Sequence, residues 1–99
     1  MSAGAADGPG CWLHVRVEGR VQGVGYRWYV SETATQLGVA GWVRNLPDGS
    51  VEVSAVGGDE ALATLRQRLS SGPRHARAER LDDLGGGERP AGATFEIAR

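Results

Sequence analysis

The stretch GRVQGVGYR, residues 19–27, separates two different hydrophobic patterns in this chain. Before it, apolar and polar residues alternate from Leu13 to Val17, and this period of two predicts a strand with one buried face. After it, apolar residues recur every three or four positions from Tyr26 to Leu37, which is the spacing of one helical face. The stretch therefore joins a strand to a helix, and its glycines allow the backbone to bend there.

Turn residues and further periodic segments predict the middle of the chain. Gly38 ends the first helix, because glycine readily adopts positive φ at a helix C-terminus. Residues 39–56 are predicted to form a β-hairpin around the turn LPDGS, residues 46–50, in which proline, aspartate and glycine each favour a turn. A second helix follows the N-cap Asp59 and stops at Gly72. Its buried stripe consists of Leu62, Leu65 and Leu69.

The last part of the chain carries weaker patterns. Residues 76–84 are rich in charge but allow an edge strand, and residues 85–92 read as a loop. Residues 94–98 predict a short final strand with Phe95 and Ile97 on one face.

The order strand, helix, strand, strand, helix, strand predicts an α+β sandwich of the ferredoxin-like kind. Right-handed crossovers place both helices on one face of an antiparallel sheet. Residues 11–99 form this one domain, and residues 1–10, which are small, polar and rich in glycine and alanine, are expected to be a flexible N-terminal tail.

Composition limits the classes of function. Hydrophobic residues make up 40% of the 99 residues, so a packed core is expected. No apolar run is long enough to cross a membrane, and the start lacks the features of a secretory signal, so we expect a cytoplasmic protein. The net charge of −1 argues against a nucleic-acid partner. We expect a monomer.

The glycine-rich stretch has the properties of an anion site. N–H groups at a helix N-terminus have no backbone partners, and glycines let several of them converge on one anion. Arg27 lies in the first turn, where its guanidinium can bind two phosphate oxygens. The nucleotide P-loop would need glycine at position 24, and the dinucleotide pattern would need it at position 28. An alternative remains open at this point, in which the glycines serve turn geometry and Arg27 is only solvated.

Two segments resemble the acylphosphatase family: VRVEGRVQGVGYRWYV, residues 15–30, and GWVRNLPDGSVEV, residues 41–53. The resemblance covers residues 13–72 well and extends more loosely to the end. It implies hydrolysis of a small acyl phosphate to a carboxylate and inorganic phosphate by direct attack of water. It also implies no metal, no cofactor and no phosphoenzyme.

The resemblance assigns roles by position. Arg27 corresponds to the arginine that binds the phosphoryl group, and Asn45 to the asparagine that holds the attacking water. The backbone N–H groups of a five-residue cradle bind phosphate. These five residues are Arg20, Val21, Gln22, Gly23 and Val24. Leu46 departs from the family, which commonly has threonine or serine there.

Some expectations come from the remaining residues. Trp28 and Trp42 are expected to pack in the core, His14 to be exposed, and Arg44 to face away from the site. The two histidines belong to no cluster with the spacing of metal ligands.

Two other functions compete with hydrolysis. One is a non-catalytic anion-binding module, which Leu46 keeps open. The other is single-stranded RNA binding on the sheet, against which stand the net charge and the lack of an aromatic pair arranged as in RRM domains.

Overall fold

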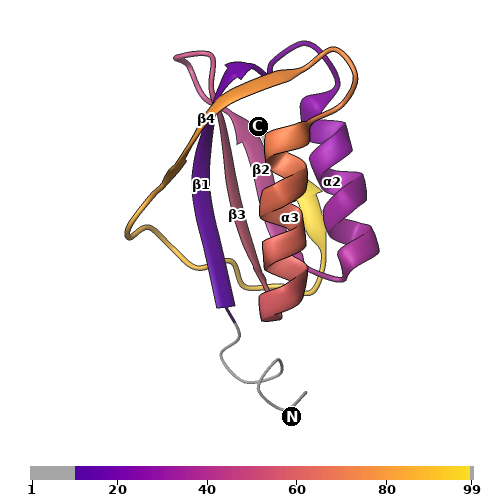
Figure 1. Ribbon diagram of the computed structural model, residues 1–99. Helices are drawn as coiled ribbons and strands as arrows, with labels where there is room; N and C mark the ends of the chain where they lie inside the picture. The colour runs from indigo at the N-terminus through magenta and orange to yellow at the C-terminus, as the bar shows by residue number, and fades with distance from the viewer. Residues whose placement is uncertain (1–10, 99) are drawn as a thin grey trace.

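The computed structural model describes residues 11–98, so the expected tail, residues 1–10, lies outside the described residues. Five strands and two helices follow one another along the chain (Figure 1). They are β1 (Cys11–Arg20), α2 (Tyr26–Leu37), β2 (Ala40–Asn45), β3 (Val51–Gly57), α3 (Asp59–Ser71), β4 (Arg77–Asp83) and β5 (Phe95–Ile97). The predicted hairpin, both helices, the edge strand and the short final strand are all present.

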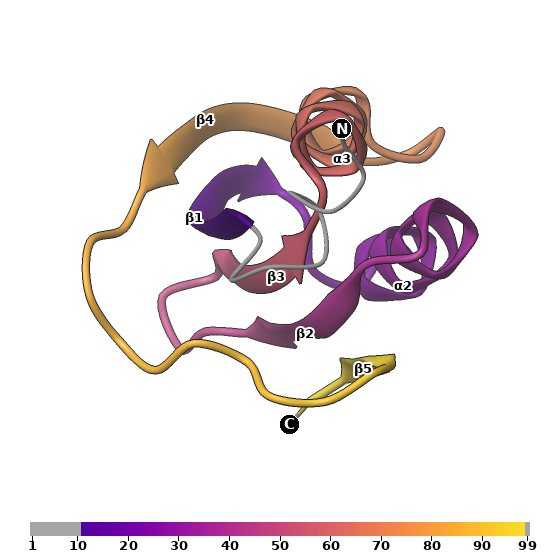
Figure 2. The ribbon, with the colours of Figure 1, turned by 90° about the horizontal axis from the view of Figure 1, so that it is seen from below.

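The strands form one sheet in the order β4-β1-β3-β2-β5. Every neighbouring pair is antiparallel except β2 and β5, which are parallel. The prediction of an antiparallel sheet is therefore correct for most of the sheet and wrong at this edge. After β4 the chain runs along the helix-free face to the opposite edge of the sheet, and it enters β5 in the direction of β2 (Figure 2).

Both helices cover the same face of the sheet, as the ferredoxin-like prediction requires (Figure 2). The core lies between these two layers. Alternate residues of the strands and one stripe of each helix supply its fully buried side chains. Among them are Val15, Val17, Tyr26, Val30, Val43, Val53, Leu65 and Leu69.

Two aromatic side chains are not where the sequence placed them. Trp28 is 64% exposed, so its predicted place in the core is wrong. It follows the buried Tyr26 by two residues, which turns it about 200° around the helix axis, away from the sheet. Trp42 lies on the helix-free face, because strand alternation sets it opposite the buried Val43.

Smaller differences concern His14, the start of α3 and Ile97. Only 11% of the His14 side chain is exposed, because the chain between β4 and β5 passes over it and Gly86 O contacts Nδ1 at 3.0 Å. The N-cap of α3 is Gly58, and Asp59 lies in the first turn, where its charge still favours the helix dipole. Phe95 is buried, whereas Ile97, at the end of the edge strand, is 43% exposed.

Gly19 explains how β4 reaches β1. The pairing register between these strands shifts at Glu18/Gly19, and the φ of Gly19 is +130°. A Cβ added there would lie 2.1 Å from the carbonyl oxygen of Arg77. Any side chain would therefore push the edge strand away.

We expect Gly19→Ala to lower the free energy of unfolding by about 3 kcal/mol, because it combines backbone strain with a clash against main chain. Gly38→Ala is the matched control, since its φ of +74° is also positive but no atom lies within 4 Å of the added Cβ. The control should cost about 1 kcal/mol. Urea unfolding measures both, and equal losses would contradict the role of close strand approach.

Candidate active site

The site lies at the end of the sheet where α2 begins. Residues 21–25, here called the cradle loop, connect β1 to α2, and residues 46–50, the hairpin turn, connect β2 to β3 at the same end (Figure 1). Asn45 is the last residue of β2, and Arg27 lies in the first turn of α2. The fold thus brings the two sequence motifs to one end of the molecule.

Apolar side chains and glycines shape the cradle loop. Val21 is 1% exposed, and Val24 packs against the core. Gly23 and Gly25 have φ values of +74° and +78°, and a Cβ added at either would meet nothing within 4 Å. The side chains of the two valines fix the loop to the core, and the two glycines leave open the space on the side of the loop that faces away from the core.

The N–H groups of the cradle loop have no partners in the described part of the protein. None of residues 21–25 donates a backbone hydrogen bond to another atom of residues 11–98. The N-cap of α2, Gly25, makes no side-chain hydrogen bond, and the first turn contains no acidic residue. Arg20, the first residue of the predicted cradle, is the last residue of β1 and pairs with Arg77 of β4. An anion in front of the loop would meet unpaired donors and the positive end of the helix dipole.

Arg27 adds a full positive charge beside these donors. Its side chain is half-buried, and it makes no ion pair or side-chain hydrogen bond within residues 11–98. Four other arginines each contact at least one carboxylate. They are Arg16, Arg44, Arg66 and Arg80. The guanidinium of Arg27 can therefore bind an anion without first breaking an ion pair.

Asn45 carries a polar atom without a partner. Its Oδ1 has almost no accessible surface and accepts no hydrogen bond from the residues that the structure describes. A buried acceptor without a hydrogen bond lowers the stability of the fold by about 1–3 kcal/mol, so a hydrogen bond from a donor to this oxygen would be favourable. Arg44, the preceding residue, contacts Glu52 on the helix-free face, as alternation predicts.

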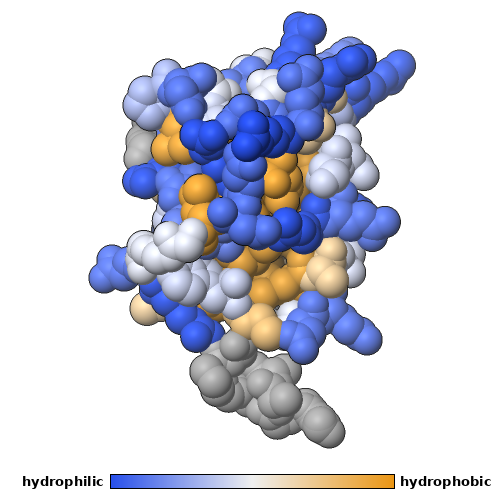
Figure 3. All heavy atoms as spheres, turned by 60° about the vertical axis from the view of Figure 1, so that its left-hand side comes forward, coloured by the Kyte–Doolittle hydropathy of each residue, from blue (hydrophilic) through white to orange (hydrophobic). Residues whose placement is uncertain are grey.

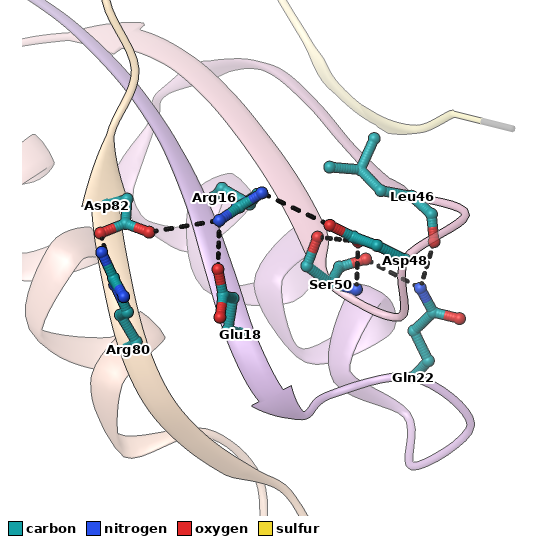
Figure 4. A network of polar contacts seen from close by, with 8 residues as sticks. All are labelled: Arg16, Glu18, Gln22, Leu46, Asp48, Ser50, Arg80 and Asp82. Atoms are coloured by element: carbon teal, nitrogen blue, oxygen red, sulfur yellow. Dashed lines mark hydrogen bonds and ion pairs between the residues drawn. The ribbon is translucent and has the colours of Figure 1, made fainter.

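The side chain of Gln22 joins the cradle loop to the hairpin turn (Figure 4). Its Nε2 donates to Leu46 O and to Ser50 O, both at 2.8 Å. Sequence reasoning assigned only the backbone of Gln22 to the site and missed this role. The polar side chain of Gln22 between Val21 and Gly23 could have indicated such a role, but its partners lie more than twenty residues away in the sequence.

Asp48 holds the hairpin turn from within. The hydroxyl and the backbone N–H of Ser50 both donate to Oδ1 of Asp48, the latter at 2.9 Å. The hydroxyl bond is the main reason that the pKa of Asp48 lies below its ordinary value. Arg16 contacts the other oxygen of Asp48 at 3.4 Å and thereby ties the turn to β1.

A hollow of about 630 Å³ lies on the helix-free face, and neither Arg27 nor Asn45 lines it. Its buried carboxylate, Glu52, contacts His14 at 2.6 Å and Arg44 at 2.8 Å. Burial would raise the pKa of Glu52, but these two partners together hold it below its ordinary value. Both oxygens of this carboxylate are already paired, so Glu52 could bind a ligand there only by giving up one of these contacts.

Residues 11–98 contain neither a candidate metal site nor a candidate membrane-spanning helix. No three His, Cys, Asp or Glu side chains lie close enough together to hold a metal ion. Neither helix is long and apolar enough to span a membrane. The metal-free reaction implied by the sequence stays a prediction.

Comparisons with known proteins show the family of this chain. The family model described as Acylphosphatase matches residues 13–97. The acylphosphatase of Azorhizobium caulinodans is 42% identical over 86 residues, which cover 87% of this chain and 92% of that protein. The acylphosphatase of Thiobacillus denitrificans is 53% identical over 70 residues, covering 71% and 79%. The crystal structure of acylphosphatase from Bacillus subtilis has a TM-score of 0.82 and 31% identity, covering 89% of this chain and 98% of that one. This chain belongs to the acylphosphatase family.

Proposed function

We propose that this protein hydrolyses the carboxyl–phosphate bond of small acyl phosphates, giving a carboxylate and inorganic phosphate. The observation that carries the proposal is the run of N–H groups over residues 21–25, which, like the nearby Arg27, have no partner within residues 11–98. Membership in the acylphosphatase family identifies the bond that is broken. The roles of Arg27, Asn45 and the cradle residues follow from the resemblance to that family, and the geometry of the site supports them.

The cradle loop and Arg27 bind the phosphoryl group. The N–H groups of residues 21–24, extended by Arg20 at the end of β1, face the phosphoryl oxygens. Arg27 binds two of these oxygens through parallel N–H bonds. Charge spreads over the equatorial oxygens in the transition state, so fixed donors stabilise it more than the ground state.

Asn45 orients the attacking water. Its carbonyl oxygen accepts a hydrogen bond from water and directs the water lone pair at phosphorus, in line with the bond to the acyl oxygen. Because Oδ1 is covered in the structure, its side chain must rotate to reach the water. The oxygen–phosphorus bond forms, the carboxylate leaves with the electron pair, and the water proton passes to a phosphoryl oxygen.

The polarity of the surface and the net charge limit the partners that this protein is expected to bind. We propose a monomeric cytoplasmic enzyme without a metal, cofactor or nucleic-acid partner. Hydrophilic residues cover most of the β4 side of the molecule, with hydrophobic residues showing only between them (Figure 3). The net charge is −1, which gives no general attraction to nucleic acid.

A non-catalytic phosphate-binding module remains the second candidate, and Leu46 is the observation that favours it. The family commonly has a hydroxyl side chain at this position, whereas Leu46 has no polar side-chain atom. If that hydroxyl is needed to orient Asn45, the site would bind phosphate without turnover.

The first test is hydrolysis of benzoyl phosphate in the presence of EDTA. Arg27→Ala should lower kcat/KM by about 10³-fold and weaken inhibition by inorganic phosphate, because it removes a charge that acts on the phosphoryl group. Asn45→Ala should lower kcat by about 10²-fold with little change in phosphate inhibition. Arg89→Ala, an exposed arginine of the loop after β4, is the control.

Parent activity that disappears with EDTA would contradict the metal-free reaction. Equal loss of phosphate affinity in the two variants would contradict the division of labour between Arg27 and Asn45. A folded parent that binds phosphate without turnover would favour the binding module.

The second test is Leu46→Thr. A hydroxyl at this position could accept a hydrogen bond from the amide nitrogen of Asn45 and hold the amide plane with Oδ1 turned toward the water, so we expect kcat to rise roughly two- to tenfold at constant KM. Leu46→Ala removes the same apolar side chain without adding a hydroxyl and should show no rise. An equal gain in both variants would mean that bulk, and not hydrogen bonding, limits the rate.

A further inference from the structure

We infer that the side-chain amide of Gln22 is a positioning group for catalysis, which fixes the end of β2, and with it Asn45, at a set distance from the phosphate cradle. The inference rests on the proposed role of Asn45. It assigns to Gln22 a side-chain function that is separate from the backbone N–H of the same residue.

The orientation of the amide is determined by its surroundings. Both bonds of Gln22 use Nε2 as the donor, and both acceptors are carbonyl oxygens at 2.8 Å. Exchanging the amide oxygen and nitrogen would place three oxygens together, so the nitrogen must face the turn. Both N–H donors of this one side chain therefore form hydrogen bonds to the same turn.

The two acceptors lie next to Asn45. Leu46 directly follows Asn45 in the chain. Ser50 directly precedes Val51, and Val51 pairs with Asn45 in the last pair between β2 and β3. The turn also closes on itself, because Leu46 N donates to Ser50 O at 2.8 Å and Gly49 N donates to Leu46 O at 3.1 Å. Gln22 therefore holds both sides of the hairpin at the point where Asn45 leaves the sheet.

No other side-chain hydrogen bond connects residues 21–25 with residues 46–50 in the described structure. On its opposite side the turn is held by Asp48, which bonds Ser50 and contacts Arg16 (Figure 4). Loss of the Gln22 hydrogen bonds should thus leave the turn folded but allow the distance between the turn and the cradle loop to vary. This separates a positioning role from a general role in folding.

The distance matters because the water on Asn45 must meet phosphorus held by the cradle. A displacement of about 1 Å between reacting groups lowers rates by about 10²-fold. We therefore expect Gln22→Met, which keeps length but has no donor, to lower kcat by about 30- to 100-fold. KM and inhibition by inorganic phosphate should change less than about twofold, because the N–H groups and Arg27 remain.

Gln22→Glu supplies a second, independent measurement. The ionised carboxylate has no donor and faces two carbonyl oxygens, whereas the protonated acid can donate one hydrogen bond. The activity of this variant relative to the parent should therefore rise as the pH falls from about 8 to about 5, where protonation of the carboxyl begins. A constant ratio over this range would contradict a role for the donors.

A double-mutant cycle tests whether Gln22 acts through Asn45. Gln22→Met should have almost no further effect on kcat in an Asn45→Ala background, whereas it should retain its full effect in an Arg20→Ala background. Gln67→Ala, an exposed glutamine of α3, is the control and should match the parent. Thermal unfolding of every variant shows whether the fold is kept.

The outcomes separate the two proposals. An active parent, an impaired Asn45→Ala and an unimpaired Gln22→Met would refute this inference alone. An undiminished effect of Gln22→Met in the Asn45→Ala background, or a loss seen only as a higher KM, would also overturn it. Full activity of Asn45→Ala would refute the proposed role of Asn45, and with it any positioning role that acts through that residue.

Discussion

The backbone N–H groups of the cradle loop, which have no partner within residues 11–98, impose the constraint on which the proposed site depends. A loop that keeps its donors available for a ligand cannot use them to hold itself in place, so other groups must do so. Here the side chains of Val21 and Val24 anchor the loop in the core, and Gln22 ties it to the hairpin turn. The left-handed glycines complete the loop, because other residues are strained at positive φ.

The sheet extends this local arrangement into a complete site. β1 ends beside the start of α2, so the cradle faces the positive end of a helix dipole. β2 runs antiparallel to β3, and β3 to β1, so the end of β2 returns to the end of β1. Alternation along β2 then sets Arg44 on the helix-free face with Glu52 and leaves Asn45 on the other side. A one-residue shift of the hairpin register would exchange these two residues.

Local patterns predicted the elements, and long-range contacts decided what the sequence missed. The strand of Val15 and the helix of Val30 follow from periodicity, because burial there depends on one face of one element. The burial of His14 depends on the chain between β4 and β5, and the parallel pairing of β5 depends on the same crossover. The bonds of Gln22 depend on residues 46 and 50, which only the folded sheet brings near.

The way in which Gln22 holds the turn also bears on the unusual Leu46. The amide of Gln22 binds the main-chain carbonyl of Leu46, and every residue type offers that carbonyl. The position of the turn is therefore independent of the side chain at this position. A hydroxyl there could orient the amide plane of Asn45, but it is not needed to place its Cα. Leucine at position 46 thus affects the rotation of the Asn45 side chain and leaves the geometry of the cradle loop and the hairpin turn unchanged.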